Sequence, residues 1–123
     1  MRFLIVLGLA FGLVGTANAQ PAGASSTVRI GGWYGALGYC QLTSISSATP
    51  LSSCTNGIPA GTGFIEVCVE TANVRYRDDG TNPTASVGMP VASGTCFPYA
   101  AAIGAIAFIA QSGSPIVNVS FYK

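Results

Sequence analysis

Clusters of glycine, proline, asparagine and serine divide the chain into short β-prone runs, and this division limits the folds that it can adopt. The clearest run, 116–122, alternates Val117, Val119 and Phe121 with polar residues. Alternation of this kind is typical of a strand with one buried face. Several such strands separated by turns predict an all-β fold, a small antiparallel β-sandwich or jelly-roll-like domain. The predicted strands are 27–30, 33–43, 63–70, 73–77, 86–91, 94–99, 103–110 and 116–122.

Two other runs refine this prediction. In 64–70 the aliphatic residues face inward, so that Cys68 shares the outer face with Glu66 and Glu70. The run 100–110 is rich in alanine, which favours a helix, but its glycine and isoleucines favour a strand. We predict that its second half is a strand that is apolar on both faces, as in a central or interface strand.

Residues 1–19 have the pattern of a cleavable secretory signal peptide. Arg2 precedes an apolar run, 4–14, and Ala17-Asn18-Ala19 provides the small residues of a cleavage site. The alternative is an uncleaved anchor, but a membrane span needs about 20 apolar residues and this run breaks at Gly15. We therefore predict a secreted or periplasmic protein with no membrane span in the mature chain.

The mature chain would consist of a flexible lead, 20–26, and a single β domain, 27–123. Beyond residue 19 the chain has four basic and four acidic residues, so its side-chain charges cancel. Binding to nucleic-acid phosphates requires an excess of lysine and arginine, and this balance argues against it. Surfaces with little charge associate readily, which predicts self-association or docking on a protein partner.

All four cysteines, Cys40, Cys54, Cys68 and Cys96, lie in the predicted β domain. An even number in a short exported chain favours disulfides, and zinc would need closely spaced cysteines or histidine. Four cysteines allow three pairings; we favour Cys40 with Cys54 and Cys68 with Cys96, because the first pair brackets a loop rich in serine, threonine and proline. Closing that loop of about 15 residues would stabilise the fold by about 3 kcal/mol. The alternative is four buried free thiols.

Enzymatic chemistry is difficult to assemble from these residues. The chain has no histidine, so the usual general base is missing. Glu66 and Glu70 would lie about 13 Å apart on one strand, too far to act on one sugar. The acidic segment 78–83 is a strong turn and a poor match to a calcium loop. The sequence therefore predicts no catalysis, no metal and no cofactor, and leaves Arg75 or Arg77 free to pair with Glu66 or Glu70 across a hairpin.

Three aromatic residues, Trp33, Tyr34 and Tyr39, lie among glycines near the start of the predicted domain. Exposed aromatic rings can stack on a sugar or anchor a protein partner, because they offer rigid apolar area with a polar tip. The alternative is that Trp33 is the core tryptophan of a small sandwich, since large aromatic side chains are mostly buried. These three residues are the candidate binding site.

Three segments in the second half of the chain form a recognisable pattern: 74–90, Ile106-Ala107-Phe108-Ile109 and Asn118-Val119-Ser120-Phe121-Tyr122. Through them, residues 74–123 resemble a family of small proteins from tailed bacteriophages and prophages that are generally regarded as minor virion components. The resemblance implies a compact β domain that packs in or on a particle, and it supplies no catalytic residues.

Two functions follow as hypotheses. The first is an exported, non-catalytic structural or assembly protein related to phage virion components, with the virion itself as an alternative location. The second is a secreted ligand-binding β module, with a carbohydrate as its ligand, that uses Trp33, Tyr34 and Tyr39.

Overall fold

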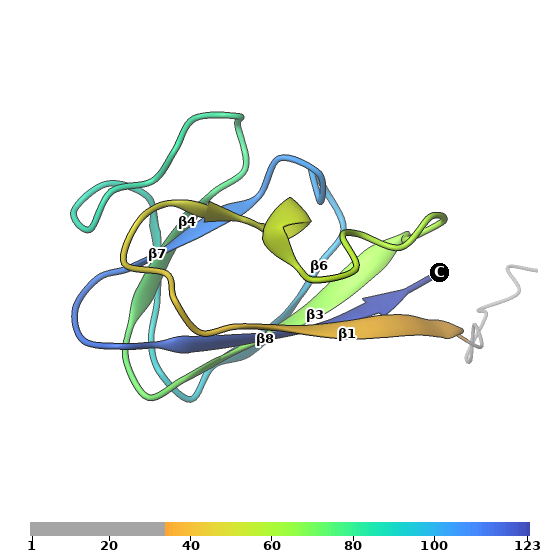
Figure 1. Ribbon diagram of the computed structural model, residues 1–123, viewed down its shortest axis with the longest axis horizontal. Coiled ribbons are helices and arrows are strands. Elements are labelled where there is room, and N and C mark those ends of the chain that lie inside the picture. The colour runs from red at the N-terminus through yellow and green to blue at the C-terminus, as the bar shows by residue number, and fades with distance from the viewer. Residues whose placement is uncertain (1–33) are drawn as a thin grey trace, which may run out of the picture. The chain divides into compact units, whose positions relative to one another are not determined.

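A computed structural model describes residues 34–123, which form a sandwich of two antiparallel β-sheets (Figure 1). Sheet A has the strand order β1-β8-β3-β6, and sheet B has the order β2-β7-β4-β5. The predicted all-β sandwich is confirmed. The strands are β1 (Ala36–Leu42), β2 (Thr49–Pro50), β3 (Phe64–Glu70), β4 (Val74–Arg77), β5 (Met89–Val91), β6 (Cys96–Tyr99), β7 (Ala107–Ala110) and β8 (Ile116–Tyr122).

One short helix interrupts the strands: the 3-10 turn η1 (Leu51–Ser53) follows β2. Across residues 34–123, no helix is long and apolar enough to cross a membrane. The predicted signal peptide, 1–19, the lead, 20–26, and the strand 27–30 lie outside the described residues.

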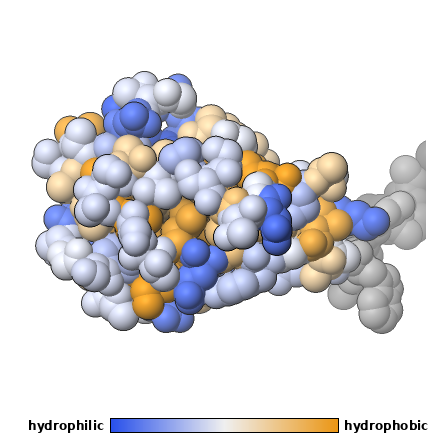
Figure 2. Space-filling view, in the orientation of Figure 1, coloured by the Kyte–Doolittle hydropathy of each residue, from blue (hydrophilic) through white to orange (hydrophobic). Residues whose placement is uncertain are grey.

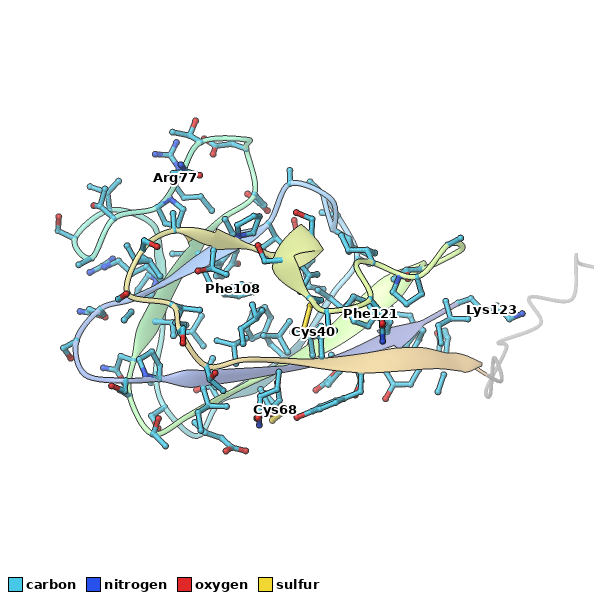
Figure 3. The ribbon with its side chains drawn as sticks, viewed as in Figure 1. Cys40, Cys68, Arg77, Phe108, Phe121 and Lys123 are labelled. Carbon is cyan, nitrogen blue, oxygen red and sulfur yellow. A yellow bond between two sulfur atoms is a disulfide. The ribbon has the colours of Figure 1, made fainter. Side chains whose placement is uncertain are left out.

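The core lies between the two sheets and is made by alternate residues of their strands. In β3 and β8 every second side chain is buried, as the sequence alternation predicts. Phe108 from sheet B and Phe121 from sheet A are the largest fully buried side chains and are labelled in Figure 3. The other residues that are at most 2% exposed include Ile45, Leu51, Ile65, Val67, Val69, Val74, Ile106, Val117 and Val119.

Several predicted strands, among them 33–43 and 94–99, are shorter in the structure, and one strand was not predicted. β5 is shorter than 86–91, because the backbones of Thr84 and Val87 hydrogen-bond to each other in a turn and the strand begins only at Met89. β7 is shorter than 103–110, because a turn closed by Ala105 N–H to Ala102 O precedes it. β2 was not predicted, since only two residues of a loop rich in serine and threonine pair with β7.

Both predicted disulfides are present. Cys40–Cys54 has a Cα–Cα distance of 5.7 Å and buried cysteines, and it ties β1 to the loop after η1. Cys68–Cys96 has a Cα–Cα distance of 4.0 Å and joins directly opposite residues of β3 and β6. Figure 3 shows Cys40 and Cys68 on opposite sides of sheet A. One disulfide therefore lies at the core, and the other lies on the outer surface of the same sheet.

Candidate functional site

The outward-facing side chains of sheet A form the candidate site. Because successive residues of a strand point to opposite faces, burying one set in the core exposes the other set on the opposite face of the sheet. Strand pairing then places side chains from distant parts of the sequence in adjacent positions. We call this surface the outer face, and it consists of Tyr39, Gln41, Phe64, Glu66, Cys68, Glu70, Cys96, Pro98, Ile116, Asn118, Ser120 and Tyr122.

An aromatic cluster occupies one end of the outer face. Phe64 of β3 lies opposite Tyr122 of β8, and their rings stack with centroids 4.8 Å apart. Tyr34, just before β1, packs edge-on against Phe64 at 4.5 Å and is 66% exposed. Aromatic pairs in these offset and edge-to-face arrangements hold one another rigid. The cluster therefore presents a fixed apolar surface to solvent.

A polar row lies next to the aromatic cluster. The Tyr39 hydroxyl donates to Asn118 Oδ1, and Gln41 Nε2 donates to the same oxygen at 2.8 Å. Gln41 lies directly opposite Asn118 in the register of β1 and β8, which explains why the two amides meet. Tyr39 is 61% exposed, so its ring remains available while its hydroxyl is held in place. The outer face thus combines oriented amide and hydroxyl groups with exposed aromatic rings.

A groove of about 660 Å³ opens beside the aromatic cluster, lined by Tyr34, Phe64, Pro98, Tyr99 and Lys123 among others. The Tyr99 hydroxyl donates to Asp78 Oδ2 at 2.6 Å and accepts from Ala102 N–H at 2.9 Å. Burial and the hydrogen bond to Asp78 raise the pKa of Tyr99 above its ordinary value. The wall formed by Tyr99 is therefore fixed and uncharged at neutral pH.

The structure places two of the three predicted binding residues on this surface. Tyr34 belongs to the aromatic cluster and Tyr39 to the polar row, whereas Trp33 lies outside the described residues. Phe64 and Tyr122 complete the surface, and neither was predicted as a binding residue. The available signal was the alternation of β3 and β8, which already places both residues on outward-facing positions.

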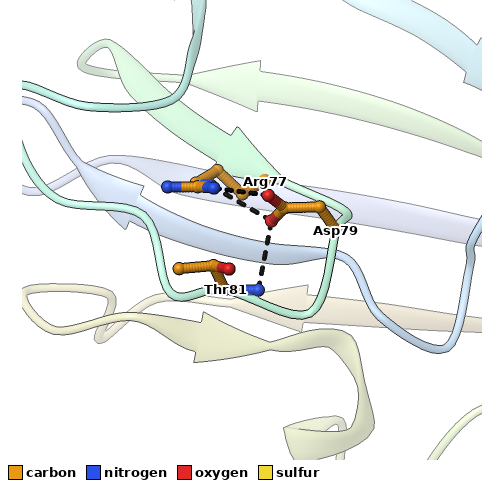
Figure 4. Close-up of polar contacts among 3 residues, drawn as sticks. All are labelled: Arg77, Asp79 and Thr81. Atoms are coloured by element: carbon orange, nitrogen blue, oxygen red, sulfur yellow. Dashed lines mark hydrogen bonds and ion pairs between the residues drawn. The ribbon is translucent and has the colours of Figure 1, made fainter.

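The acidic residues Asp78 and Asp79 both hydrogen-bond to neighbouring groups of the protein. No cluster of three potential metal-ligating side chains occurs within residues 34–123. Asp79 is engaged instead: Arg77 forms an ion pair with its carboxylate, and Thr81 N–H donates to it at 3.1 Å (Figure 4). The hydrogen bond from Arg77 is the main cause that lowers the pKa of Asp79 to about 2. Both carboxylates of the segment 78–81 therefore have partners, Asp78 in Tyr99 and Asp79 in Arg77 and Thr81.

The predicted pairing of Arg75 or Arg77 with Glu66 or Glu70 is wrong. Those glutamates belong to sheet A, whereas both arginines belong to β4 of sheet B. The Arg75 side chain instead donates to backbone oxygens of the loop before β5, at 3.0 Å to Ala85 and 2.8 Å to Gly88. The arginines therefore organise the long loop that joins β4 to β5.

Comparison with known proteins adds no further constraint. No family model, curated protein or solved structure matches the chain. The surface itself is therefore the basis for proposing a function.

Proposed function

We propose that this protein is an exported, non-catalytic structural component that joins an assembly through the outer face of sheet A. The two disulfides are compatible with a periplasmic or extracellular location, where such bonds persist. The resemblance of residues 74–123 to small phage virion proteins suggests the kind of assembly, a virus-like particle or a structure derived from one.

The observation that carries this proposal is the combination of exposed aromatic rings and fixed polar groups on one sheet face. Tyr34 and Tyr39 are among the most exposed large apolar side chains of the described residues. Tyrosine is enriched at the energetic centres of protein interfaces, because it buries a large area at a small entropic cost. A rigid scaffold with two cross-links loses little entropy when such a surface binds. These properties suit attachment to another protein surface.

The direct test is co-purification with particles. Particles from the source organism, banded on a density gradient, should contain this chain in a constant ratio to the main shell protein. A Tyr39→Ser, Tyr122→Ser double variant should fold but be lost from the band, whereas Met89→Ser, another exposed apolar residue away from the outer face, should be retained. Finding the wild-type chain only in the free exported fraction would refute the assembly role.

A second candidate is a carbohydrate-binding module, and the polar row favours it. Asn118 and Gln41 hold amide groups beside the Tyr39 ring, a combination that can bond sugar hydroxyls while the ring packs on a sugar face. Neutral glycans are the expected class, because the charged side chains of the outer face, Glu66 and Glu70, are both acidic and would repel acidic sugars. Glycan-array binding that is lost in Tyr39→Ala and kept in Met89→Ala would support this alternative.

A further inference from the structure

The four edge strands of the sandwich are not equally protected. An edge strand carries N–H and C=O groups that have no partner in its sheet and can pair with another chain. The edges are β1 and β6 in sheet A, and β2 and β5 in sheet B. Three of them contain a proline: Pro50 in β2, Pro90 in β5 and Pro98 in β6. Proline lacks the N–H that an added strand needs, so these three edges are poor sites for strand addition.

β1 is the edge strand without this protection. It spans seven residues and contains neither a proline nor a charged residue. A bulge between Ala36 and Gly38 interrupts its first part, but residues 38–42 continue in regular register with β8. Long, uncharged edges are the ones that natural proteins usually block. β1 is therefore the edge strand that is best suited to pair with a strand of another chain.

The hydrogen-bond pattern identifies the free peptide groups of β1. Lys123, the residue after β8, donates its N–H to Gly35 O. Because every second residue of a strand bonds to the same neighbour, the odd-numbered residues of β8 are the ones that hydrogen-bond to β1. Tyr39 and Gln41 lie opposite even-numbered residues of β8. Because alternate residues of a strand bond to opposite neighbours, the N–H and C=O groups of Tyr39 and Gln41 point away from β8 to the open side.

A groove runs along the open side of β1. The loop 54–59 lies beside β1 and is fixed there by the Cys40–Cys54 disulfide, leaving a groove of about 410 Å³ between loop and strand. Among the described residues, no backbone hydrogen bond joins this loop to β1. Figure 2 shows this side of the molecule, where hydrophobic residues are scattered in several places among hydrophilic ones. Backbone pairing, rather than a large apolar patch, is the interaction that this side offers.

We infer that β1 pairs with β1 of a second copy, antiparallel about a two-fold axis near Cys40. In this register Tyr39 of each copy lies opposite Gln41 of the other, so the free N–H and C=O groups of both residues find partners. The two uncharged strands do not repel each other. Sheet A then continues into sheet A of the second copy, and the two outer faces form one larger surface. The inference rests on the proposed assembly function and names one partner in it.

Amide hydrogen exchange on the purified mature chain tests this pairing. In dilute protein the amides of Tyr39 and Gln41 should exchange quickly, while those of Cys40 and Leu42, which bond to β8, should exchange slowly. Raising the concentration from about 10 μM to about 1 mM should slow exchange at Tyr39 and Gln41 by about fivefold or more, because dimer formation follows mass action. Sedimentation over the same range should show a dimer.

A pair of variants isolates the backbone contribution. Gln41→Pro removes the outward N–H without breaking the ladder to β8 and should abolish dimerisation, whereas Gln41→Val keeps that N–H and should still dimerise. A dimer in which the amides of Tyr39 and Gln41 exchange as fast as in the monomer would overturn the inference. A chain that stays monomeric at about 1 mM would also overturn it, and so would a chain in which these two amides are protected at every concentration. None of these results would affect particle co-purification, which tests the proposed function separately.

Discussion

Removing each disulfide in turn should show whether loop-closure entropy or burial of the cysteine side chains decides which disulfide stabilises the fold more. The cross-linked cysteines are 14 residues apart in Cys40–Cys54 and 28 apart in Cys68–Cys96. In the chain-entropy model, loops of these lengths stabilise the fold by about 3 and about 3.6 kcal/mol. On entropy alone, losing Cys68–Cys96 would therefore be the more costly change, by about 0.6 kcal/mol.

Burial reverses that order. Cys40 and Cys54 are 7% and 6% exposed and belong to the core cluster, whereas Cys96 is exposed on the outer face. Replacing both buried cysteines by alanine leaves a gap where two sulfur atoms packed. The lost burial should lower the free energy of unfolding by about 1 kcal/mol for each sulfur. We therefore expect the Cys40→Ala, Cys54→Ala variant to lose about 5 kcal/mol in total.

Urea unfolding followed by circular dichroism measures the difference. The Cys68→Ala, Cys96→Ala variant should lose about 3.6 kcal/mol, so its unfolding midpoint should lie above that of the Cys40→Ala, Cys54→Ala variant. If the free energy of unfolding falls with urea concentration at the same slope in both variants, both unfold to equally exposed states. The opposite order of midpoints would mean that burial of Cys40–Cys54 contributes less than the loop lengths do, and would refute this reasoning.

Two further predictions concern the loop between β4 and β5 and its neighbours. Gly88 has φ +136°, and a Cβ there would lie 2.8 Å from the Tyr76 carbonyl oxygen. Gly88→Ala should therefore lower the free energy of unfolding, measured by thermal unfolding, by about 2 to 3 kcal/mol. Gly104→Ala is the control and should change this free energy little, because a Cβ on Gly104 has no neighbour within 4 Å. The carboxyl of Asp79 should titrate near pH 2 by NMR, and Arg77→Ala should raise that midpoint toward 3.8. Because the folded-state pKa is lowered, the stabilisation from this pair is present above pH 3.8 and is lost as the pH falls toward 2.

The parts of the fold that sequence predicts best are those where one buried face imposes strict alternation. The strands 64–70 and 116–122 match the sequence pattern to within a residue, because each has three inward apolar residues. β2 escaped prediction because its pairing depends on the position of β7, which the local sequence does not encode. The turn before β7 was predicted as strand, because Ile103 and Ile106 are apolar residues of a kind that strands bury. In the structure both are buried, but they lie in the turn that precedes β7.

The outer face was predictable in part. Tyr34 and Tyr39 stand out in the sequence because they lie among glycines. Tyr122 and Phe64 join them only through the register of β8 and β3, which brings together residues 58 positions apart in the chain. Alternation predicts the face on which each side chain lies, but neighbours across strands depend on which strands pair.

The measurement that tests the account most directly is hydroxyl-radical footprinting of the outer face in the free and assembled protein. In the free chain, the exposed rings of Tyr34 and Tyr39 should be oxidised readily. In purified particles both tyrosines should be strongly protected, while Met89, which is 59% exposed and lies on sheet B, should react to the same extent as in the free chain. Equal oxidation of Tyr34 and Tyr39 in the two states would contradict the claim that the protein assembles through the outer face of sheet A.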